Sequence, residues 1–318
     1  MGLRWGVLGA ARIAQKLIPA IAQAGGQVTA VASRDRPRGQ AFATTYGIGR
    51  VVSYEELLAD PEIDAVYNPL PNDLHLPWSI SALQAGKHVL CEKPMTLSAE
   101  QAAELARVAA HANRVVFEAF AYQFAPVMAE AVRLVRSGAI GEVRSCRGTF
   151  SFVLPEGEDF RWQPAHGGGA LFDIGCYPVH LTRLMLGEPL AVSAQGRWTS
   201  SNVDIALHGT LRYAQALASF QCSFDEVHHE AFEVVGTAGR LTLDGHLFSN
   251  VGEVRLRLNE QEQLFPYENA YARMVSHVQE LVTRSLEDQR TSAAAAVAQG
   301  RVIDALLQSA REQRAVRL

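Results

Sequence analysis

Two short motifs place titratable side chains where protons could be moved. Glu92-Lys93-Pro94 follows an apolar run, and Asp173 stands four residues before Tyr177 in the second half of the chain. If the latter segment opens a helix, residues four apart share a face, so both side chains can point into one cleft. A phenol and an ammonium are suitable partners for acid and base catalysis, because the positive charge stabilises the phenolate. These residues predict chemistry at an exchangeable hydroxyl proton.

A glycine-containing turn stands near the beginning of the chain. From Gly9 the sequence follows a G-x-A-x-x-A pattern, a weakened form of the dinucleotide fingerprint in which small residues let the backbone approach a pyrophosphate. A tight strand-to-helix turn without a ligand is the alternative. Its position favours the nucleotide site, because a second strand ends at Ala32, about where the ribose would lie. The candidate pyrophosphate contacts are Gly9, Ala11, Arg12 and Ile13.

The residues after that second strand indicate the kind of dinucleotide. Ser33 stands where an NAD site carries an acidic residue, and Arg34, Arg36 and Arg38 follow. A charge-assisted hydrogen bond of about 1.5–3 kcal/mol to a 2′-phosphate would give roughly a ten- to hundredfold preference for NADP(H). The alternative is a solvated loop whose charge Asp35 partly offsets, with NAD as a possible cofactor. Ser33, Arg34 and Arg38 are the candidate ribose and phosphate contacts.

The elements that must position these residues alternate in the first third of the chain. Apolar runs typical of buried parallel strands alternate with stretches of helical periodicity. The runs are Arg4 to Leu8, Val28 to Ala32, Ala65 to Tyr67, His88 to Cys91 and Val115 to Ala119. This βαβ rhythm predicts an α/β Rossmann-type doubly wound parallel sheet over residues 1–121, the dinucleotide-binding domain.

Residues 122–318 have a different pattern, with strand-like segments separated by short turns. The segments are Val143 to Val153, Leu190 to Thr199, Ile205 to Arg212, Ala216 to Phe224, Ala231 to Val235, Leu241 to Leu243 and Val254 to Leu258. They predict an α+β substrate-binding and dimerisation domain with a large, open, mainly antiparallel sheet. Helices are expected at 171–186, 270–286 and 291–314. Packing of the last two against the first domain is left open.

Composition excludes several classes of partner. The chain has 318 residues, 48% of them hydrophobic, with a net charge of −4, so a nucleic-acid partner is disfavoured. Its apolar runs are shorter than the ~20 residues of a membrane span, and the first residues do not resemble a secretory signal, so the cytoplasm is the expected location. Four widely spaced cysteines predict reduced, buried thiols and no metal site.

Three segments together resemble a known family. They are Asn68 to His75, Ala85 to Pro94 and Glu118 to Phe120. In this combination, and over nearly the whole chain, the sequence is similar to the glucose–fructose oxidoreductase, inositol dehydrogenase and MocA family of NAD(P)-dependent oxidoreductases. The resemblance implies that Lys93 is a catalytic-site lysine, often with a cis bond before the proline. It also implies cofactor contacts from the two segments, at Leu70, Asn72, His75, Glu92 and Lys93.

Tyr177 indicates a subgroup of that family. It lies in the segment Gly167 to His180, where relatives of the inositol dehydrogenase type carry a histidine. The tyrosine resembles the subgroup that contains D-xylose 1-dehydrogenase and dihydrodiol dehydrogenase. The chain departs from the family at Gln123 and Ala125, where relatives carry an arginine and a histidine, and this weakens any transfer of substrate identity. The candidate substrate contacts are Arg161, Tyr122 and His180.

The resemblance implies hydride transfer between a nicotinamide and a carbon of a sugar or polyol. Tyr177 is the candidate base, and Lys93 at ~4 Å would contribute about 4 kcal/mol at an effective dielectric of ~20, lowering the phenol pKa by roughly three. Asp173 would orient the sugar hydroxyls or Lys93. Aldose oxidation and keto-sugar reduction both remain open.

Two further hypotheses concern function and assembly. A non-catalytic regulator that senses NADP or sugar on the same fold is the alternative function; it predicts loss of Lys93 or Tyr177, and both are present. A homodimer or homotetramer through the second-domain sheet is expected. The alternation from Ala216 to Phe224 predicts one covered sheet face, whether by helices or by another subunit.

Overall fold

The computed structural model describes residues 2–318, apart from the side chains at 286, 289 and 291. Contacts within the chain divide it into two units. Unit 1 comprises Met1–Phe120 and Tyr271–Val297, and unit 2 comprises Ala121–Ala270 and Ala298–Leu318. The long helix α9 (Leu286–Glu312) therefore belongs to both.

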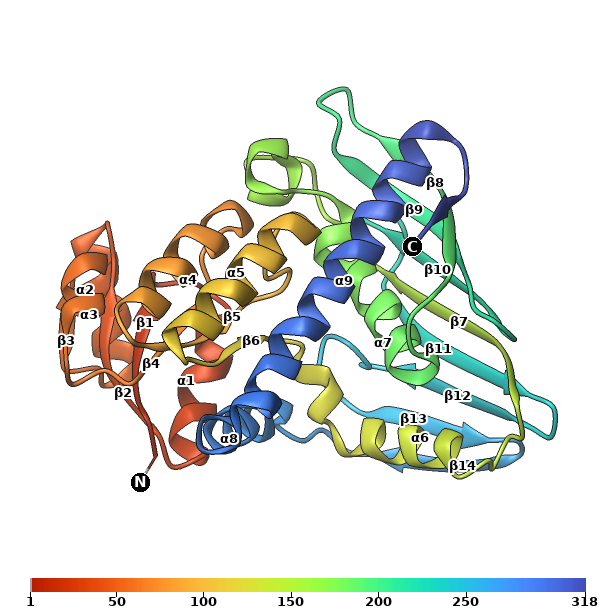
Figure 1. Ribbon diagram of the computed structural model, residues 1–318, viewed down its shortest axis with the longest axis horizontal. Helices are drawn as coiled ribbons and strands as arrows, with labels where there is room; N and C mark the ends of the chain where they lie inside the picture. Colours follow the sequence, from red (N-terminus) through yellow and green to blue (C-terminus); the bar gives the residue numbers. More distant parts are fainter. Residues whose placement is uncertain (1) are drawn as a thin grey trace. The chain divides into compact units, whose positions relative to one another are not determined.

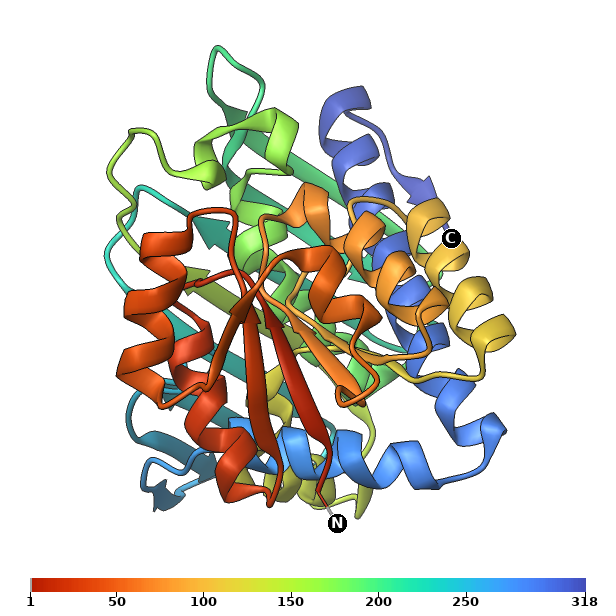
Figure 2. The same cartoon turned by 90° about the vertical axis from the view of Figure 1, so that its left-hand side faces the viewer.

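Unit 1 contains a six-stranded sheet in the order β3-β2-β1-β4-β5-β6 (Figures 1 and 2). Every neighbouring pair is parallel. The strands are β1 (Arg4–Leu8), β2 (Gln27–Ala32), β3 (Arg50–Val52), β4 (Ala65–Asn68), β5 (His88–Cys91) and β6 (Val116–Glu118). Strand order reverses between β1 and β4, and an open α/β sheet binds its ligands at such a point, beyond the carboxyl ends of the strands.

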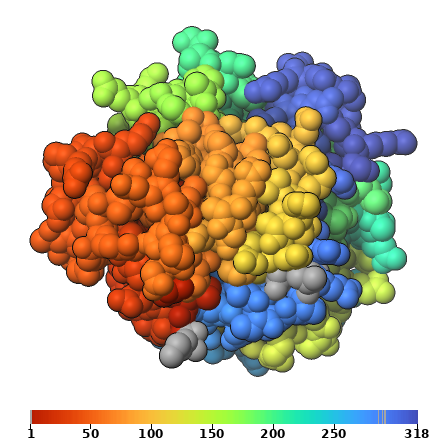
Figure 3. Space-filling view, turned by 60° about the vertical axis from the view of Figure 1, so that its left-hand side comes forward, coloured from red at the N-terminus to blue at the C-terminus, as the bar shows by residue number. Residues whose placement is uncertain are grey.

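The helices of unit 1 begin and end at residues suited to those places. They are α1 (Ala14–Gln23), α2 (Arg36–Tyr46), α3 (Tyr54–Ala59), α4 (His75–Gln84), α5 (Ala99–Ala112), α8 (Ala270–Thr283) and the first part of α9. Ser53 and Glu56 form a reciprocal capping box at α3, and Ser98 accepts the Gln101 N–H at the start of α5. Figure 3 shows α4 and α5, orange to yellow, at the surface of this unit.

Unit 2 contains a nine-stranded sheet in the order β14-β13-β12-β11-β7-β10-β9-β8-β15. Its strands are β7 (Val143–Ser151), β8 (Ala191–Trp198), β9 (Asp204–Arg212), β10 (Leu217–Ser223), β11 (His229–Gly236), β12 (Arg240–Gly245), β13 (Val254–Leu258), β14 (Gln261–Phe265) and β15 (Val316–Arg317). Only the central pair, β7 and β10, is parallel among the pairings described. The sheet is therefore mixed but mainly antiparallel.

Helices cover one face of this sheet and leave the other open (Figure 1). They are α6 (Pro126–Arg136), α7 (Cys176–Leu186) and the last part of α9. Gly148 brings α7 close to β7, because a Cβ there would lie 2.6 Å from the Cβ of Pro178. Ala218, Phe220 and Cys222 are buried on this face, so the predicted alternation along β10 is confirmed.

The expected fold class is confirmed in both units. The observed elements differ from the predicted ones at the sheet edges and at one helix start. The short strands β3, β14 and β15 were not anticipated. The helix predicted at 171–186 begins with a π-helical turn, Leu171–Gly175, before α7. All four cysteines are buried and free, as expected. Among the described residues, no helix is long and apolar enough to span a membrane.

Candidate active site

The glycine turn after β1 has a geometry that only glycine allows. Gly9 has a φ of +85° and its N–H donates to the Ala32 carbonyl at 2.7 Å. A Cβ at this position would lie 3.0 Å from Cδ2 of Leu70 and 3.5 Å from the hydroxyl of Tyr54. The backbone from Ala11 to Ile13 then leads into α1, and its carbonyls accept the N–H groups of Ala14, Gln15 and Lys16 at 3.0 to 3.2 Å. The turn fits a pyrophosphate, because it is built of small residues and ends at a helix N-terminus, which attracts anions.

Three exposed arginines, Arg34, Arg36 and Arg38, follow β2 beside this turn. Arg38 donates from Nη2 to the Ala10 carbonyl at 2.9 Å, which joins its side chain to the glycine turn. Burial raises the pKa of Tyr54, and a hydrogen bond and the charge of Arg34 partly oppose that effect. This basic surface at the end of β2 fits a phosphate on the ribose.

The segment after β4 is fastened by two buried side chains. Asn68 donates to the His75 carbonyl at 3.1 Å. The His75 ring lies 2.7 Å from the Leu70 carbonyl through Nε2 and 2.7 Å from the Pro94 carbonyl through Nδ1. Burial lowers the His75 pKa to about 4, and the contacts with the two carbonyls oppose that effect. His75 therefore joins the segment that contains Asn72 to the turn after β5.

The Glu-Lys-Pro turn follows β5 at the same sheet edge. Glu92 is buried and accepts the Tyr67 hydroxyl at 2.6 Å. Burial raises the pKa of Glu92, partly opposed by the Tyr67 hydrogen bond and the Lys93 ammonium. Lys93 is partly buried, and its peptide bond to Pro94 is cis. The cofactor candidates of unit 1 therefore gather at the carboxyl ends of β1, β2, β4 and β5.

In unit 2, Tyr177 lies in the first turn of α7 among aromatic rings. Its ring centroid is 5.6 Å from Tyr122, 5.6 Å from Phe150 and 5.5 Å from Phe248. Tyr122 is buried, and its hydroxyl lies 2.7 Å from Nδ1 of His180. Burial lowers the pKa of His180 to about 3, so this ring is neutral. Tyr177, Tyr122 and His180 thus form one cluster.

Asp173 forms an ion pair instead of facing Tyr177 alone. Arg161 donates from Nε to Oδ2 of Asp173 at 2.8 Å and from Nη1 to Asp159 at 3.1 Å. The Asp173 side chain is 13% exposed and that of Arg161 is 31% exposed, so this pair is partly shielded from water. Arg161 and Asp173 therefore act as a unit at the start of the helix that presents Tyr177.

The glycine run before this helix is required by a buried carboxylate. Asp204, at the start of β9, accepts the Leu171 N–H at 2.7 Å. A Cβ on Gly169, whose φ is +125°, would lie 1.9 Å from Oδ1 of Asp204. A Cβ on Gly168 would lie 2.4 Å from the Arg161 carbonyl. The glycines let Asp204 and the Arg161 loop approach the backbone that leads to Tyr177.

Several contributors to the site escaped the sequence analysis. Tyr67, Phe150, Asp204 and Phe248 contact the predicted residues from other elements. Phe150 lies at an inward-facing position of a predicted strand, so it was the easiest of these four residues to predict. Phe248 lies in a loop, where periodicity provides no signal.

Comparison with known proteins identifies the family. A model described as "Oxidoreductase family, NAD-binding Rossmann fold" matches residues 3–120, and one described as "GFO/IDH/MocA C-terminal domain" matches residues 128–242. The chain belongs to the GFO/IDH/MocA oxidoreductase family. The resemblance seen in the motifs is thereby confirmed, as is the prediction of an oxidoreductase.

Three members of the GFO/IDH/MocA family are close relatives or structural neighbours. D-xylose 1-dehydrogenase (NADP(+)) 2 from Haloferax volcanii is 42% identical over 75% of this chain and 75% of its own. The aldose-aldose oxidoreductase from Caulobacter crescentus, solved with glycerol, has a TM-score of 0.89 at 27% identity over 100% of both chains. A 3-ketoreductase from Actinomadura kijaniata, solved with NADP and TDP-benzene, has a TM-score of 0.87 at 31% identity over 97% of this chain and 98% of its own. It has also been solved with a single tyrosine or a single lysine replaced.

Asp204 predicts a pH-dependent stability of unit 2. Burial raises its pKa to about 7, while an unfolded carboxyl titrates near ~3.9. Between these values the folded state binds the extra proton, so the free energy of unfolding falls as pH rises, by up to about 4 kcal/mol over the window. Asp204→Asn removes this contribution.

The measurement is urea unfolding of both proteins from pH 4 to pH 8, taking the difference between them at each pH. The difference cancels the contribution of the buried histidines, which titrate in both. We expect the advantage of the native protein to shrink across this range. Parallel curves would show that Asp204 is ionised throughout.

Proposed function

We propose that this protein is an NADP(H)-dependent oxidoreductase that transfers hydride between the nicotinamide and a carbon of a sugar or polyol. It would act as an aldose dehydrogenase or a keto-sugar reductase. The observation that carries the proposal is the Glu92-Lys93-Pro94 turn at the carboxyl edge of a family-matched dinucleotide sheet. The related proteins named above, a xylose dehydrogenase, an aldose-aldose oxidoreductase and a 3-ketoreductase, support a sugar-like substrate.

The cofactor is proposed from the basic surface after β2. Ser33, Arg34 and Arg38 would contact the 2′-phosphate, and the turn from Gly9 to Ile13 would hold the pyrophosphate. The residues that would line the nicotinamide end are Leu70, Asn72, His75, Glu92 and Lys93. The His75 ring would also hold this segment and the Lys93 turn together through its contacts with the Leu70 and Pro94 carbonyls. The named cofactor of the xylose dehydrogenase and the NADP bound to the 3-ketoreductase support this choice.

The acid–base pair is proposed to be Tyr177 and Lys93. When bound, the nicotinamide supplies or accepts the hydride. Tyr177 would take the hydroxyl proton during oxidation and return it during reduction, and the Lys93 ammonium would stabilise the phenolate and the developing alkoxide. Asp173, held by Arg161, would orient the sugar hydroxyls or Lys93, with Arg161, Tyr122 and His180 completing the substrate contacts. The single lysine and tyrosine variants solved for the 3-ketoreductase involve these two residue types.

A substrate screen tests the proposed reaction. Aldoses with NADP or NAD, and keto-sugars with NADPH, are followed at the nicotinamide absorbance. We expect turnover of at least one sugar, with kcat/KM for NADP roughly ten- to a hundredfold above that for NAD. NADPH binding without turnover of any sugar would support the regulator instead.

Arginine variants test the cofactor assignment in the same assay. Arg34→Ala should lower kcat/KM for NADP by about tenfold or more and leave the value for NAD unchanged, because only NADP has the 2′-phosphate. Arg36→Ala is the matched control, since it removes a neighbouring charge that is not assigned a contact. Equal effects of Arg34→Ala on both cofactors would contradict the assignment.

Lys93→Met and Tyr177→Phe test the acid–base pair. Each should lower kcat by roughly 10²–10⁴-fold, the usual contribution of a positioned acid or base, while NADPH binding measured by fluorescence stays within a few-fold. Tyr213→Phe is the control for the tyrosine, since it removes a buried hydroxyl that has no hydrogen-bond partner among the described residues. Lys87→Met is the control for the lysine, at the opposite end of β5. Normal turnover in both active-site variants would overturn the assignment.

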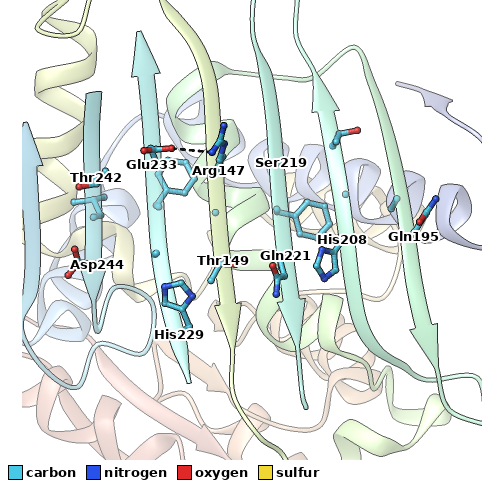
Figure 4. Close-up of a pocket in the computed structure, with 18 of the residues that line it drawn as sticks. Arg147, Thr149, Gln195, His208, Ser219, Gln221, His229, Glu233, Thr242 and Asp244 are labelled. Atoms are coloured by element: carbon cyan, nitrogen blue, oxygen red, sulfur yellow. Dashed lines mark ion pairs between the residues drawn. The ribbon is translucent and has the colours of Figure 1, made fainter. Parts of the chain in front are cut away.

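We also propose a homodimer or homotetramer formed through the open face of the unit 2 sheet. This face has a shallow hollow of about 800 Å³ and bears mainly short or uncharged polar side chains. Figure 4 shows Thr149, Ser219 and Gln221 near its centre and Gln195 toward one edge, with the Arg147–Glu233 ion pair beside Thr149 and Ser219. Its charged side chains pair with one another, as Arg257 does with Asp244, so this broad sheet face suits a second copy of the same surface.

Sedimentation tests this assembly. The native chain should sediment at two or four times its mass of 34.6 kDa. Thr149→Arg places a charge at the middle of the face and should yield a single-chain species. Gln215→Arg, in the exposed turn between β9 and β10, should not. A native protein that is monomeric at tens of micromolar would contradict the proposal.

A further inference from the structure

Three potential metal ligands meet on the helix-covered side of the unit 2 sheet. His228 precedes β11, Glu230 lies within β11, and His246 follows β12. One ligand atom from each lies within 4.8 Å of the other two. Glu230 is buried whereas its neighbour His229 is exposed, as expected for consecutive residues that face opposite sides of a strand.

The carboxylate of this cluster is held in place by the backbone. Its Oε2 accepts the N–H of Phe248 at 2.5 Å and the N–H of Ser249 at 3.0 Å. Its Oε1 lies 2.9 Å from Nε2 of His228, and the Glu230 side chain is 0% exposed. The two backbone hydrogen bonds to Oε2 orient the carboxylate as in a ligating group. Oε1 and the His228 ring now contact each other, and on metal binding both would turn to the ion instead.

The two imidazoles of the cluster are less buried than its carboxylate. Their ring centroids are 5.6 Å apart at an interplanar angle of 30°. The His228 side chain is 47% exposed, and His246 is partly buried. A hydrated ion can therefore reach the cluster from solvent, and water can fill the coordination positions that the protein leaves open.

The donor set indicates which ions fit. Two imidazole nitrogens and one carboxylate suit zinc and neighbouring transition metals, whereas calcium and magnesium prefer oxygen ligands. Donors about 2.1 Å from a tetrahedral zinc ion are about 3.4 Å from one another. Nε2 of His228 lies 2.9 Å from Oε1 of Glu230, and all three ligand atoms lie within 4.8 Å of one another, so rotations of the two imidazoles would have to bring the donors to this spacing.

We propose that His228, Glu230 and His246 form a binding site for a divalent transition-metal ion, with zinc as the expected occupant. The ion would join the start of β11 to the loop after β12. That loop contains Phe248, whose ring packs on Tyr177 at 5.5 Å and on Phe150 at 5.6 Å. Metal binding would thus stiffen the wall behind Tyr177, and the site does not depend on the proposed reaction.

Zinc titration tests the site. Tag-free protein is stripped with a chelator, dialysed and titrated with ZnCl₂ by calorimetry. We expect one equivalent of zinc per chain, and an affinity about tenfold or more weaker in both His228→Ala and His246→Ala. His229→Ala is the matched control, because it removes the adjacent histidine on the opposite face and should retain native affinity.

Two readouts separate a coordinating cluster from surface binding. Cobalt bound to the native protein and to His229→Ala should produce visible absorption typical of nitrogen coordination, and His228→Ala should lose it. Zinc should raise the melting temperature of the same two proteins and not that of His228→Ala. The proposal is overturned if the native protein binds no zinc at about 100 µM, which is roughly the weakest dissociation constant expected of a specific site. It is equally overturned if all variants bind zinc alike.

Discussion

The presentation of Tyr177 depends on a carboxylate buried beneath the helix that carries it. Asp204 accepts the Leu171 N–H from below, and its oxygen lies where any side chain at residue 169 would have to be. The glycine at 169 is thus the consequence of this contact. A buried carboxyl is costly to ionise. The contact that orders the start of the helix therefore depends on the protonation state of Asp204.

A comparable constraint organises the other unit. The His75 ring lies between the Leu70 and Pro94 carbonyls, and Glu92 is held by Tyr67 beneath the sheet edge. His75 and Glu92 are both buried, and their partners are backbone carbonyls and the hydroxyl of Tyr67. Displacing either side chain would therefore leave a buried polar atom without a partner. Buried residues therefore set the position of the turn that contains Lys93.

Aromatic packing connects the candidate base of unit 2 to distant segments of that unit. Tyr122, Phe150 and Phe248 come from a 3-10 turn, a central strand and a loop, and each places its ring against Tyr177. Such rings add shape to the site at little cost in side-chain entropy, because each has only two rotatable bonds. The loop that contains Phe248 is held in turn by the buried Glu230.

The sequence alone determined the two-part architecture, the oxidoreductase family and most of the strands that are buried on both faces. Periodicity reports burial, so strands such as β1 and β5 were predicted at their observed bounds, whereas edge strands such as β14 were not, because pairing rather than burial stabilises them. Local spacing also placed Asp173 and Tyr177 near one helix start. Only the tertiary structure decided that Asp173 pairs with Arg161 and that Asp204 and Phe248 support the site. Those contacts join residues far apart in the chain, and no local pattern records which strand or loop will meet another.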